Sequence, residues 1–319
     1  MMFGLAHQLW RNGVVGLNKR NADYLLTYNE RKYYPMADDK LLAKEIAQGI
    51  GINVPTLYGK FEYPHEVGNY HEVTDDHAEF VVKPACGAGG DGILVILGKT
   101  EGYFTLADGS AIDEDDMAFH LHDILAGAFS LAGQPDKALI EYRVNFDPVF
   151  DKVTYKGVPD IRIIVFCGVP VMAMLRLPTL MSAGKANLHQ GALGAGISIP
   201  SGRTLTAVWR NIVVERHPDT KNTITNIEIP HWDDLLDMAA RCCDLTKLNF
   251  LGIDIVLDKN RGPLMLELNA RPGLNIQIAN REGLLKRLEL IEANIQALET
   301  ASDRVAFAKQ YFSPNPIAY

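Results

Sequence analysis

Asp254, Glu267 and Asn269 are the residues whose types and spacing indicate chemistry most directly. Apolar and polar residues alternate in residues 264–273, which predicts a strand with Glu267 and Asn269 on the same face. Residues 252–258 predict a second strand, and a hairpin would bring Asp254 beside the other two side chains. Carboxylate and amide oxygens are ligands that Mg²⁺ prefers. The pattern also fits a half-exposed hairpin whose polar residues only face water.

A second signal lies upstream, where a predicted strand over residues 79–84 carries Lys83 near its end. A glycine-rich segment follows, with Gly87, Gly89, Gly90 and Gly92, and then another predicted strand over residues 93–97. The glycines match a dinucleotide fingerprint only weakly, because that motif requires a helix after them. A flexible glycine hairpin can bind phosphates through backbone N–H groups, and a lysine can neutralise phosphate charge. A glycine-rich surface turn is the alternative interpretation.

The two signals, in this order, resemble the ATP-grasp superfamily. The resemblance implies an α+β fold whose two lobes hold ATP, with Asp254, Glu267 and Asn269 as ligands of two Mg²⁺ ions, which Mn²⁺ could replace. It also implies a lysine at the start of a helix, a glycine lid, a hinge strand over residues 138–144, and arginines that contact phosphate or the acyl substrate. The corresponding cofactor-binding residues are Lys40, Lys83, Gly87, Gly89, Gly90, Glu141 (for the ribose), Tyr142 and Val144, and the catalytic arginines are Arg162 and Arg176.

Residues 185–192 resemble the Arg-Ser-Asn-Leu-His-Arg-Gly-Gly segment of the α-L-glutamate ligase-like branch, which includes the ribosomal-protein glutamate ligases. This likeness implies a catalytic role for Asn187. Both arginines of the segment are replaced, by Lys185 and Gln190, so the use of glutamate is left open. Arg271 is expected to contact the substrate or an acyl phosphate, and its alternative role is a salt bridge beside the following turn.

The coarse organisation consists of three segments. Residues 1–78 predict a helical arm and connector, residues 79–145 a first lobe with the glycine lid, and residues 146–319 a second lobe with the metal site. Most relatives carry a full α/β domain before the first lobe, whereas the short arm resembles sugar-transfer-associated ATP-grasp proteins. Helices are expected over residues 113–132 and from near Glu282 onward.

Composition excludes several function classes. The net charge is −8, with 31 basic and 39 acidic residues and no Lys/Arg stripe, which disfavours nucleic acid as a partner. No apolar stretch is long enough to span a membrane and no secretory signal is recognisable, so we expect a cytoplasmic protein. The four cysteines have no zinc spacing. A homo-oligomer is compatible with all of these features.

We therefore expect an ATP- and Mg²⁺-dependent ligase that joins a carboxylate to an amine through an acyl phosphate. Its substrates would be small molecules or peptides. Two alternatives stay open, a phosphotransferase that acts on a small molecule and a nucleotide-binding scaffold without turnover.

Overall fold

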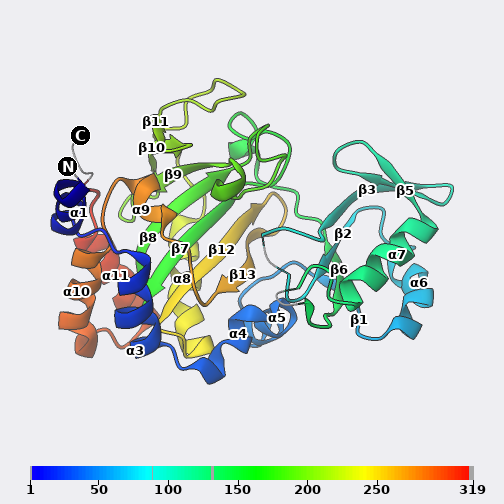
Figure 1. The fold of residues 1–319 in the computed structure, drawn as a ribbon, viewed down its shortest axis with the longest axis horizontal. Coiled ribbons are helices and arrows are strands. Elements are labelled where there is room, and N and C mark those ends of the chain that lie inside the picture. Colours follow the sequence, from blue (N-terminus) through cyan, green and yellow to red (C-terminus); the bar gives the residue numbers. More distant parts are fainter. Residues whose placement is uncertain (1, 88, 131–132, 316–319) are drawn as a thin grey trace.

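The computed structural model describes residues 2–87, 89–130 and 133–315. Within these residues the strands form a six-stranded sheet and a seven-stranded sheet, each in its own lobe (Figure 1). The predicted α+β architecture of two lobes with a short helical N-terminal arm is therefore confirmed.

The first lobe is built on the six-stranded sheet in the order β1-β6-β2-β3-β4-β5. Its strands are β1 (Leu57–Phe61), β2 (Phe80–Pro84), β3 (Leu94–Thr100), β4 (Tyr103–Leu106), β5 (Ala111–Asp113) and β6 (Ala138–Tyr142), and its helices are α6 (Tyr70–Thr74) and α7 (Glu114–Leu125). Because β1 pairs with β6, this sheet includes a strand from the segment expected to be only arm and connector. The boundaries at residues 78 and 145 stay predictions.

The local sequence explains where helix α7 of this lobe begins and ends. The Asp113 side chain accepts a hydrogen bond from the Asp116 N–H, which satisfies one of the free donors at the helix start. Met117 and Leu121 are fully buried on its apolar face. The helix ends near Gly127, where a Cβ would lie 2.2 Å from the Gln134 carbonyl oxygen. It is thus shorter than expected, and residues 131–132 lie outside the described residues.

The second lobe is built on the seven-stranded sheet in the order β11-β10-β9-β8-β7-β12-β13. Helix α8 packs on β7, β8 and β12, and helix α9 packs on β8, β9 and β10. β7, β8 and β12 are mostly buried, as their continuous apolar sequences require. The elements are β7 (Asp160–Phe166), β8 (Val169–Leu177), β9 (Leu193–Ile197), β10 (Thr204–Trp209), β11 (Ile212–Val214), α8 (Trp232–Thr246), β12 (Phe250–Asp258), β13 (Gly262–Asn269), α9 (Asn275–Asn280), α10 (Leu285–Asn294) and α11 (Ala301–Tyr311).

The C-terminal helical region differs from the single long helix expected from near Glu282. It consists of α10 and α11 with a short 3₁₀ turn, Ile295–Ala297, between them. Leu288 and Ile291 are fully buried, and Leu298 after the turn is buried at 8% exposure, whereas Ile295 is 37% exposed, so the apolar stripe is interrupted only at the turn.

The N-terminal arm runs along the second lobe before it reaches the first (Figure 1). Its helices are α1 (Met2–Arg11), α2 (Leu17–Lys19), α3 (Leu26–Tyr28), α4 (Pro35–Asp38) and α5 (Lys40–Gly49). The Val15 N–H donates to Gln277 Oε1 at 2.8 Å, and the Gln277 amide donates back to the Val15 carbonyl at 2.9 Å. These reciprocal hydrogen bonds bind the arm to α9.

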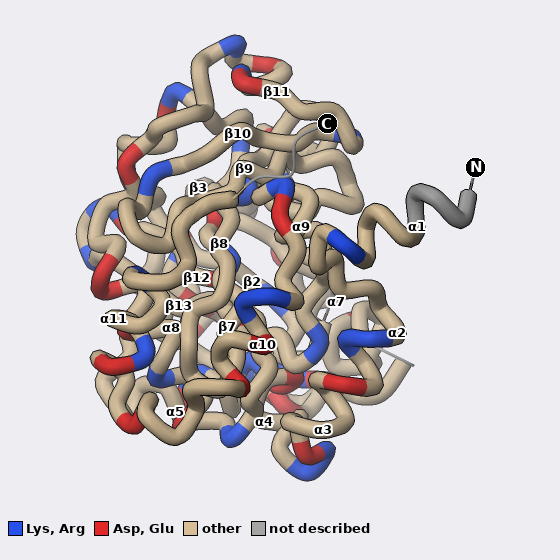
Figure 2. Tube along the Cα trace, turned by 90° about the vertical axis from the view of Figure 1, so that its left-hand side faces the viewer, with Lys and Arg blue, Asp and Glu red and all other residues tan. Residues whose placement is uncertain are grey.

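Charged residues of both signs are interspersed on the side of the molecule drawn in Figure 2, without a continuous basic face. Among the described helices, none has the length and apolar character needed to cross a membrane.

Candidate active site

Five charged side chains lie on one face of the second sheet because of its strand register. Asp254 on β12 is paired with Glu267 on β13 and with Arg162 on β7, and Asp160 is paired with Arg176 on β8. Directly paired residues point to the same side of a sheet. The predicted hairpin is thereby confirmed, and it brings Asp254 next to Glu267.

Asp254 is the centre of a buried ion network. Arg162 Nε donates to its Oδ1 at 2.6 Å, and Arg176 Nη2 donates to its Oδ2 at 2.6 Å. Arg176 also binds Asp160 with two hydrogen bonds, one of them 2.6 Å long from Nη2 to Oδ2. The guanidinium groups of Arg162 and Arg176 therefore neutralise the carboxylates of Asp160 and Asp254, on the same sheet face as Glu267.

The network separates the pKa values of its two aspartates. Burial alone would raise the pKa of Asp254, but the charges of Arg162 and Arg176 outweigh burial and hold it well below its usual range. Burial, together with the charge of Asp254, raises the pKa of Asp160 to about 6 despite its pairing with Arg176. Burial alone would lower the pKa of Arg176, but the negative charges of Asp160 and Asp254 outweigh burial and raise the pKa of its guanidinium. Asp254 is thus the permanent anion of the site.

The oxygens of Asp254, Glu267 and Asn269 are of the kind that bind Mg²⁺, although the three side chains differ in exposure and in the partners they already have. The Glu267 side chain is one-third exposed, and its Oε2 lies 3.7 Å from Lys40 Nζ. The Asn269 amide nitrogen is buried without a partner among the described residues. Asp254 already accepts from both arginines, so a metal ligand role would require it to exchange one of these hydrogen bonds. No group of three His, Cys, Asp or Glu residues in the described chain offers another metal site.

A second buried ion cluster lies in the first lobe, where Glu141 on β6 binds two lysines. Its Oε2 pairs with Lys44 of α5 and its Oε1 with Lys83 of β2. The sequence analysis did not include Lys44 among the site residues. Its position four residues after Lys40 in a helix, which places both on one face, was the signal that could have found it.

The cluster contains two buried lysines and only one carboxylate, and this arrangement shifts the pKa values of Lys44 and Glu141. Burial, reinforced by the charge of Lys83, lowers the pKa of Lys44 to about 7. Burial opposes ionisation of Glu141, but the charges of Lys83 and Lys44 outweigh it and lower the pKa of its carboxyl. A protonated Lys44 therefore needs a second anion nearby to be fully stabilised.

The three residues expected at the hinge, Glu141, Tyr142 and Val144, make different kinds of contact. Both Glu141 oxygens are paired with lysines, and the expected contact of Glu141 with the ribose stays a prediction. The Tyr142 N–H donates to the Thr56 carbonyl and its hydroxyl to Asp258 Oδ2. Val144 packs with Val256 and other apolar residues of the second lobe, which suits the wall of a planar base.

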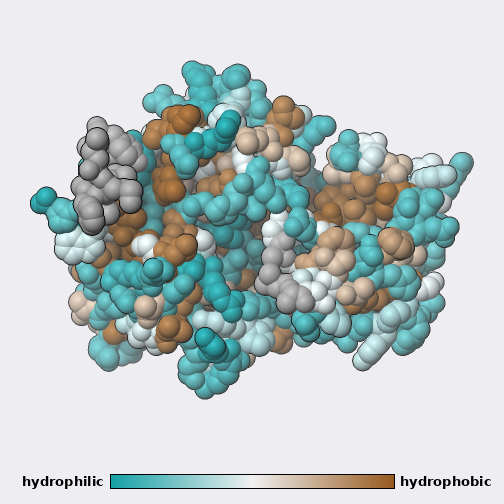
Figure 3. All heavy atoms as spheres, viewed as in Figure 1, coloured by the Kyte–Doolittle hydropathy of each residue, from teal (hydrophilic) through white to brown (hydrophobic). Residues whose placement is uncertain are grey.

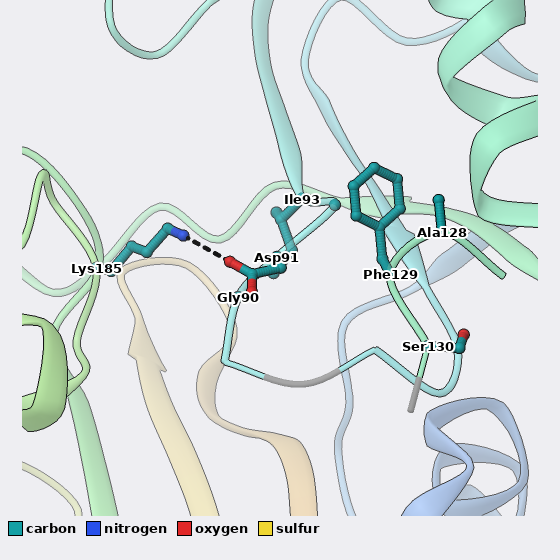
Figure 4. Close-up of a pocket in the computed structure, with 8 residues that line it drawn as sticks. Gly90, Asp91, Ile93, Ala128, Phe129, Ser130 and Lys185 are labelled. Carbon is teal, nitrogen blue, oxygen red and sulfur yellow. Dashed lines mark hydrogen bonds and ion pairs between the residues drawn. The ribbon is translucent and has the colours of Figure 1, made fainter. Parts of the chain in front are cut away.

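The glycine loop joins β2 to β3 and contacts the second lobe (Figure 4). Gly89 and Gly90 have φ values of 69° and 80°, a backbone region that favours glycine. Lys40 Nζ donates to the Gly87 carbonyl, and Lys185 Nζ lies 3.1 Å from Asp91 Oδ1. A cavity of about 540 Å³ lies beside the loop, with Gly90 and Lys185 in its lining. Residue 88 of the loop lies outside the described residues.

Residues 19–293 match a family model described as sugar-transfer associated ATP-grasp. The chain belongs to this family. The expected resemblance to ATP-grasp proteins and the expected fold are thereby confirmed. No curated protein matches the chain.

Several solved structures are similar to this chain at low identity. The ATP-grasp ligase PsnB in complex with a minimal precursor is 15% identical with a TM-score of 0.43, and the match covers 84% of this chain and 63% of PsnB. D-alanine–D-alanine ligase from Bacillus anthracis in complex with ATP is 14% identical with a TM-score of 0.44, covering 87% and 67%. The D-cycloserine synthetase DcsG is 14% identical with a TM-score of 0.45, covering 88% and 80%. This chain thus spans less than two thirds of the length of PsnB.

Within this ATP-grasp fold, Asn187 and Arg271 have structural partners. Asn187 Oδ1 accepts from the His189 N–H at 3.0 Å and so shapes the loop before β9. Arg271 Nη1 lies 3.2 Å from Asp38 Oδ2, and its guanidinium lies over the Tyr34 ring at 4.3 Å. Arg271 therefore makes the salt bridge that the sequence analysis gave as its alternative role, and catalytic roles for both residues stay predictions.

The arm supports the turn that follows β13. Arg20 is buried, and its Nη1 donates to the Pro272 carbonyl at 2.7 Å and to the Arg271 carbonyl at 3.4 Å. Asn29 holds the neighbouring strand, since its amide group donates to the Phe250 carbonyl and accepts from the Phe250 N–H. The arm thus positions the end of β13.

We expect Arg20→Met to lower the free energy of unfolding by about 1.5–3 kcal/mol, because it leaves buried carbonyls without a charged donor. Urea unfolding measures the change. The control is Arg203→Met, since Arg203 is an exposed arginine paired with exposed Glu228. Equal unfolding free energies in the two variants would contradict the supporting role of Arg20.

Proposed function

We propose that this protein is an ATP-dependent carboxylate–amine ligase that acts through an acyl phosphate. The observation that carries the proposal is the convergence of Arg162 and Arg176 on one sheet face beside Glu267. Such a fixed group of cations and carboxylates suits stabilisation of a transferring phosphoryl group and of an acyl phosphate. Lys40 and Lys44 of the arm and Lys83 of the first lobe add positive charge.

In the first step, a substrate carboxylate oxygen would attack the γ-phosphorus of ATP, and ADP would leave. Lys83 and Lys44 would bind phosphate oxygens in exchange for part of their pairing with Glu141. Arg162 and Arg176 would face the charge that develops on the transferring group. Mg²⁺, held by Glu267, Asn269 and Asp254, would neutralise phosphate charge.

In the second step, an amine nitrogen would attack the acyl carbon, phosphate would leave with the former carboxylate oxygen, and the amine would lose a proton to solvent. The glycine loop would exclude water from the acyl phosphate, and its contacts with Lys40 at the Gly87 carbonyl and with Lys185 at Asp91 support this role. Exclusion of water favours the amine over hydrolysis.

The proposal is tested by ADP release from Mg²⁺-ATP over panels of amino acids, peptides and acidic sugars, with mass spectrometry of the products. Hydroxylamine, a general nucleophile, should trap the acyl phosphate as a hydroxamate. A ligase yields ADP, phosphate and an amide in equal amounts. A phosphorylated product that never yields an amide or hydroxamate would instead identify a phosphotransferase. ATP binding without turnover over the full panel would identify a scaffold.

Glutamate is expected to be a poor amine substrate, because Lys185 and Gln190 stand where the resembling branch has arginines. Lys185 is paired with Asp91, and Gln190 Oε1 is buried without a partner in the described part of the chain. We expect Lys185→Arg together with Gln190→Arg to raise glutamate-dependent ADP release about tenfold, a gain of about 1.4 kcal/mol. Efficient use of glutamate by the unmodified protein would contradict this assignment of the segment.

A further inference from the structure

The N-terminal helix α1 exposes large apolar side chains. Trp10 is 65% exposed and Leu9 is 43% exposed. Neither is among the described side chains that pack on the apolar cores of the two lobes. The Trp10 ring stacks on His7 of the same helix, with ring centroids 5.9 Å apart. Six of the ten residues of α1 are apolar and none is acidic, so this helix offers an apolar surface to something outside the fold.

The base of α1 is fixed to the second lobe, whereas the helix extends away from it. The Leu285 N–H donates to the Gly13 carbonyl at 3.0 Å, just before the reciprocal hydrogen bonds of Val15 with Gln277. A Cβ at Gly283 would lie 2.2 Å from the Gly13 carbonyl oxygen, so the two backbones are in close contact. Figure 2 shows α1 at the side of the molecule, pointing away from the neighbouring helices. The anchored base therefore presents the helix to solvent.

The charge of this end of the chain is opposite to that of the rest. The first 22 residues contain three basic and no acidic residues, whereas the remaining residues contain 28 basic and 39 acidic ones and give the chain its net charge of −8. Such an asymmetry is typical of a segment that binds an anionic surface. Of the three basic residues, Arg20 is buried and Lys19 pairs with Asp23, which leaves Arg11.

A second cation lies at the base of the helix. Lys286 of α10 lies beside Gly13, and its side chain is exposed. In the part of the chain that the structure describes, neither Arg11 nor Lys286 has an ion-pair partner. Acidic side chains occur further along the arm, where Glu292 accepts from the Tyr28 hydroxyl at 2.8 Å. The unpaired positive charge is thus concentrated at α1 and its base.

The position of α1 suits contact with an extended surface. It lies at the end of the second lobe that is remote from the first lobe (Figure 1). On the broad face drawn in Figure 3, hydrophobic residues form separate patches between hydrophilic ones, which does not favour lying flat on a bilayer. With ten residues, α1 is about 15 Å long, half the thickness of a hydrocarbon core, so it can lie on a membrane but cannot cross it.

We propose that α1 binds the surface of a membrane that contains anionic lipids. The helix lies among the headgroups, with Leu9 and Trp10 inserted toward the acyl chains and with Arg11 and Lys286 at lipid phosphates. Tryptophan is favoured at this depth because its ring is apolar while its N–H can still donate to water or headgroups. A second copy of the chain would instead bring the same basic residues against α1. This inference does not depend on the ligase function.

Flotation with vesicles of equimolar phosphatidylcholine and phosphatidylglycerol measures this binding. The unmodified protein should bind them at least about tenfold more tightly than vesicles of phosphatidylcholine alone, and higher salt should weaken the binding. Trp10→Ser and Arg11→Glu should each weaken it at least about tenfold. Both residues are exposed, so these variants should fold. The controls Leu26→Ser and Arg31→Glu, at exposed positions of the arm beyond α1, should bind like the unmodified protein.

Tryptophan emission tests the insertion itself. Vesicles should shift the emission of the unmodified protein to shorter wavelength, and Trp10→Phe should lose this shift while its binding stays within about twofold. A shift that persists in Trp10→Phe would overturn the insertion of Trp10. Equal binding to both kinds of vesicle, or unchanged binding by Trp10→Ser, would overturn the proposal. A dimer in sedimentation that Trp10→Ser converts to a monomer, without vesicle binding, would also overturn it and assign α1 to a second copy of the chain.

Discussion

Glu267→Gln should lower the turnover number for Mg²⁺-dependent ATP cleavage at least about a hundredfold, which corresponds to about 2.7 kcal/mol of barrier. Of the two carboxylates of the proposed metal site, Glu267 has no guanidinium partner among the described residues, whereas Asp254 accepts from both Arg162 and Arg176. Replacement by an amide keeps the size of the side chain but removes the charge that would hold the ion. Steady-state ADP release at several Mg²⁺ concentrations measures the effect.

The matched control for this substitution is Glu228→Gln, because Glu228 is an exposed glutamate of the same lobe that pairs only with Arg203 at the surface. Both variants should keep the thermal unfolding midpoint of the unmodified protein, since Glu267 is itself partly exposed. Turnover by a folded Glu267→Gln variant at the original rate and Mg²⁺ dependence would remove Glu267 from the metal site.

Lys44→Met should weaken ATP binding at least tenfold and abolish a proton uptake that accompanies it. Burial and the charge of Lys83 lower the pKa of Lys44 to about 7, so at pH 8 most of the free protein carries a neutral Lys44. An ATP phosphate beside it would favour the charged form and raise this pKa, so binding at pH 8 should take up a proton. At pH 6 the lysine is already charged, and the uptake should be small. Calorimetry in buffers of different ionisation enthalpy measures the protons exchanged.

Lys60→Met provides the comparison, because Lys60 is an exposed lysine of the same lobe that pairs with Glu62. It should retain both the affinity and the proton uptake of the unmodified protein. Lys83→Ala should also weaken ATP binding, since Lys83 shares Glu141 with Lys44. If Lys44→Met bound ATP with unchanged affinity and unchanged proton uptake, the buried lysines would not be part of the nucleotide site.

The sequence alone was sufficient to predict the hairpin that pairs Asp254 with Glu267. Period-two alternation assigns Glu267 and Asn269 to one face of a strand, and a turn between neighbouring strands favours antiparallel pairing. The same local logic predicted the glycine hairpin between β2 and β3 and a helix that begins near residue 113. These features depend on residues that are close in the chain, so their spacing carries the information.

Tertiary structure alone decided which side chains share each carboxylate. Asp254 is 92 residues from Arg162 and 78 from Arg176, and Lys44 is 97 residues from Glu141. Spacing along one strand or helix gives the face on which a side chain lies but not the strand register or packing that brings two distant faces together. For this reason the sequence did not indicate that Lys44 and Lys83 share Glu141.

The arm and a cavity of the second lobe also separate what local sequence predicts from what long-range packing decides. A short helical arm could be predicted from residue types, but the contact of Arg20 with the Pro272 carbonyl joins positions 252 residues apart. A cavity of the second lobe combines the loop before β9, the β10–β11 turn and α9, which are separated from one another in the chain. The sequence by itself thus determined the family, the order of the motifs and the face of each element, because these are local properties. The ion partners, the support of β13 and the cavity depend on long-range packing, and only the folded chain determines them.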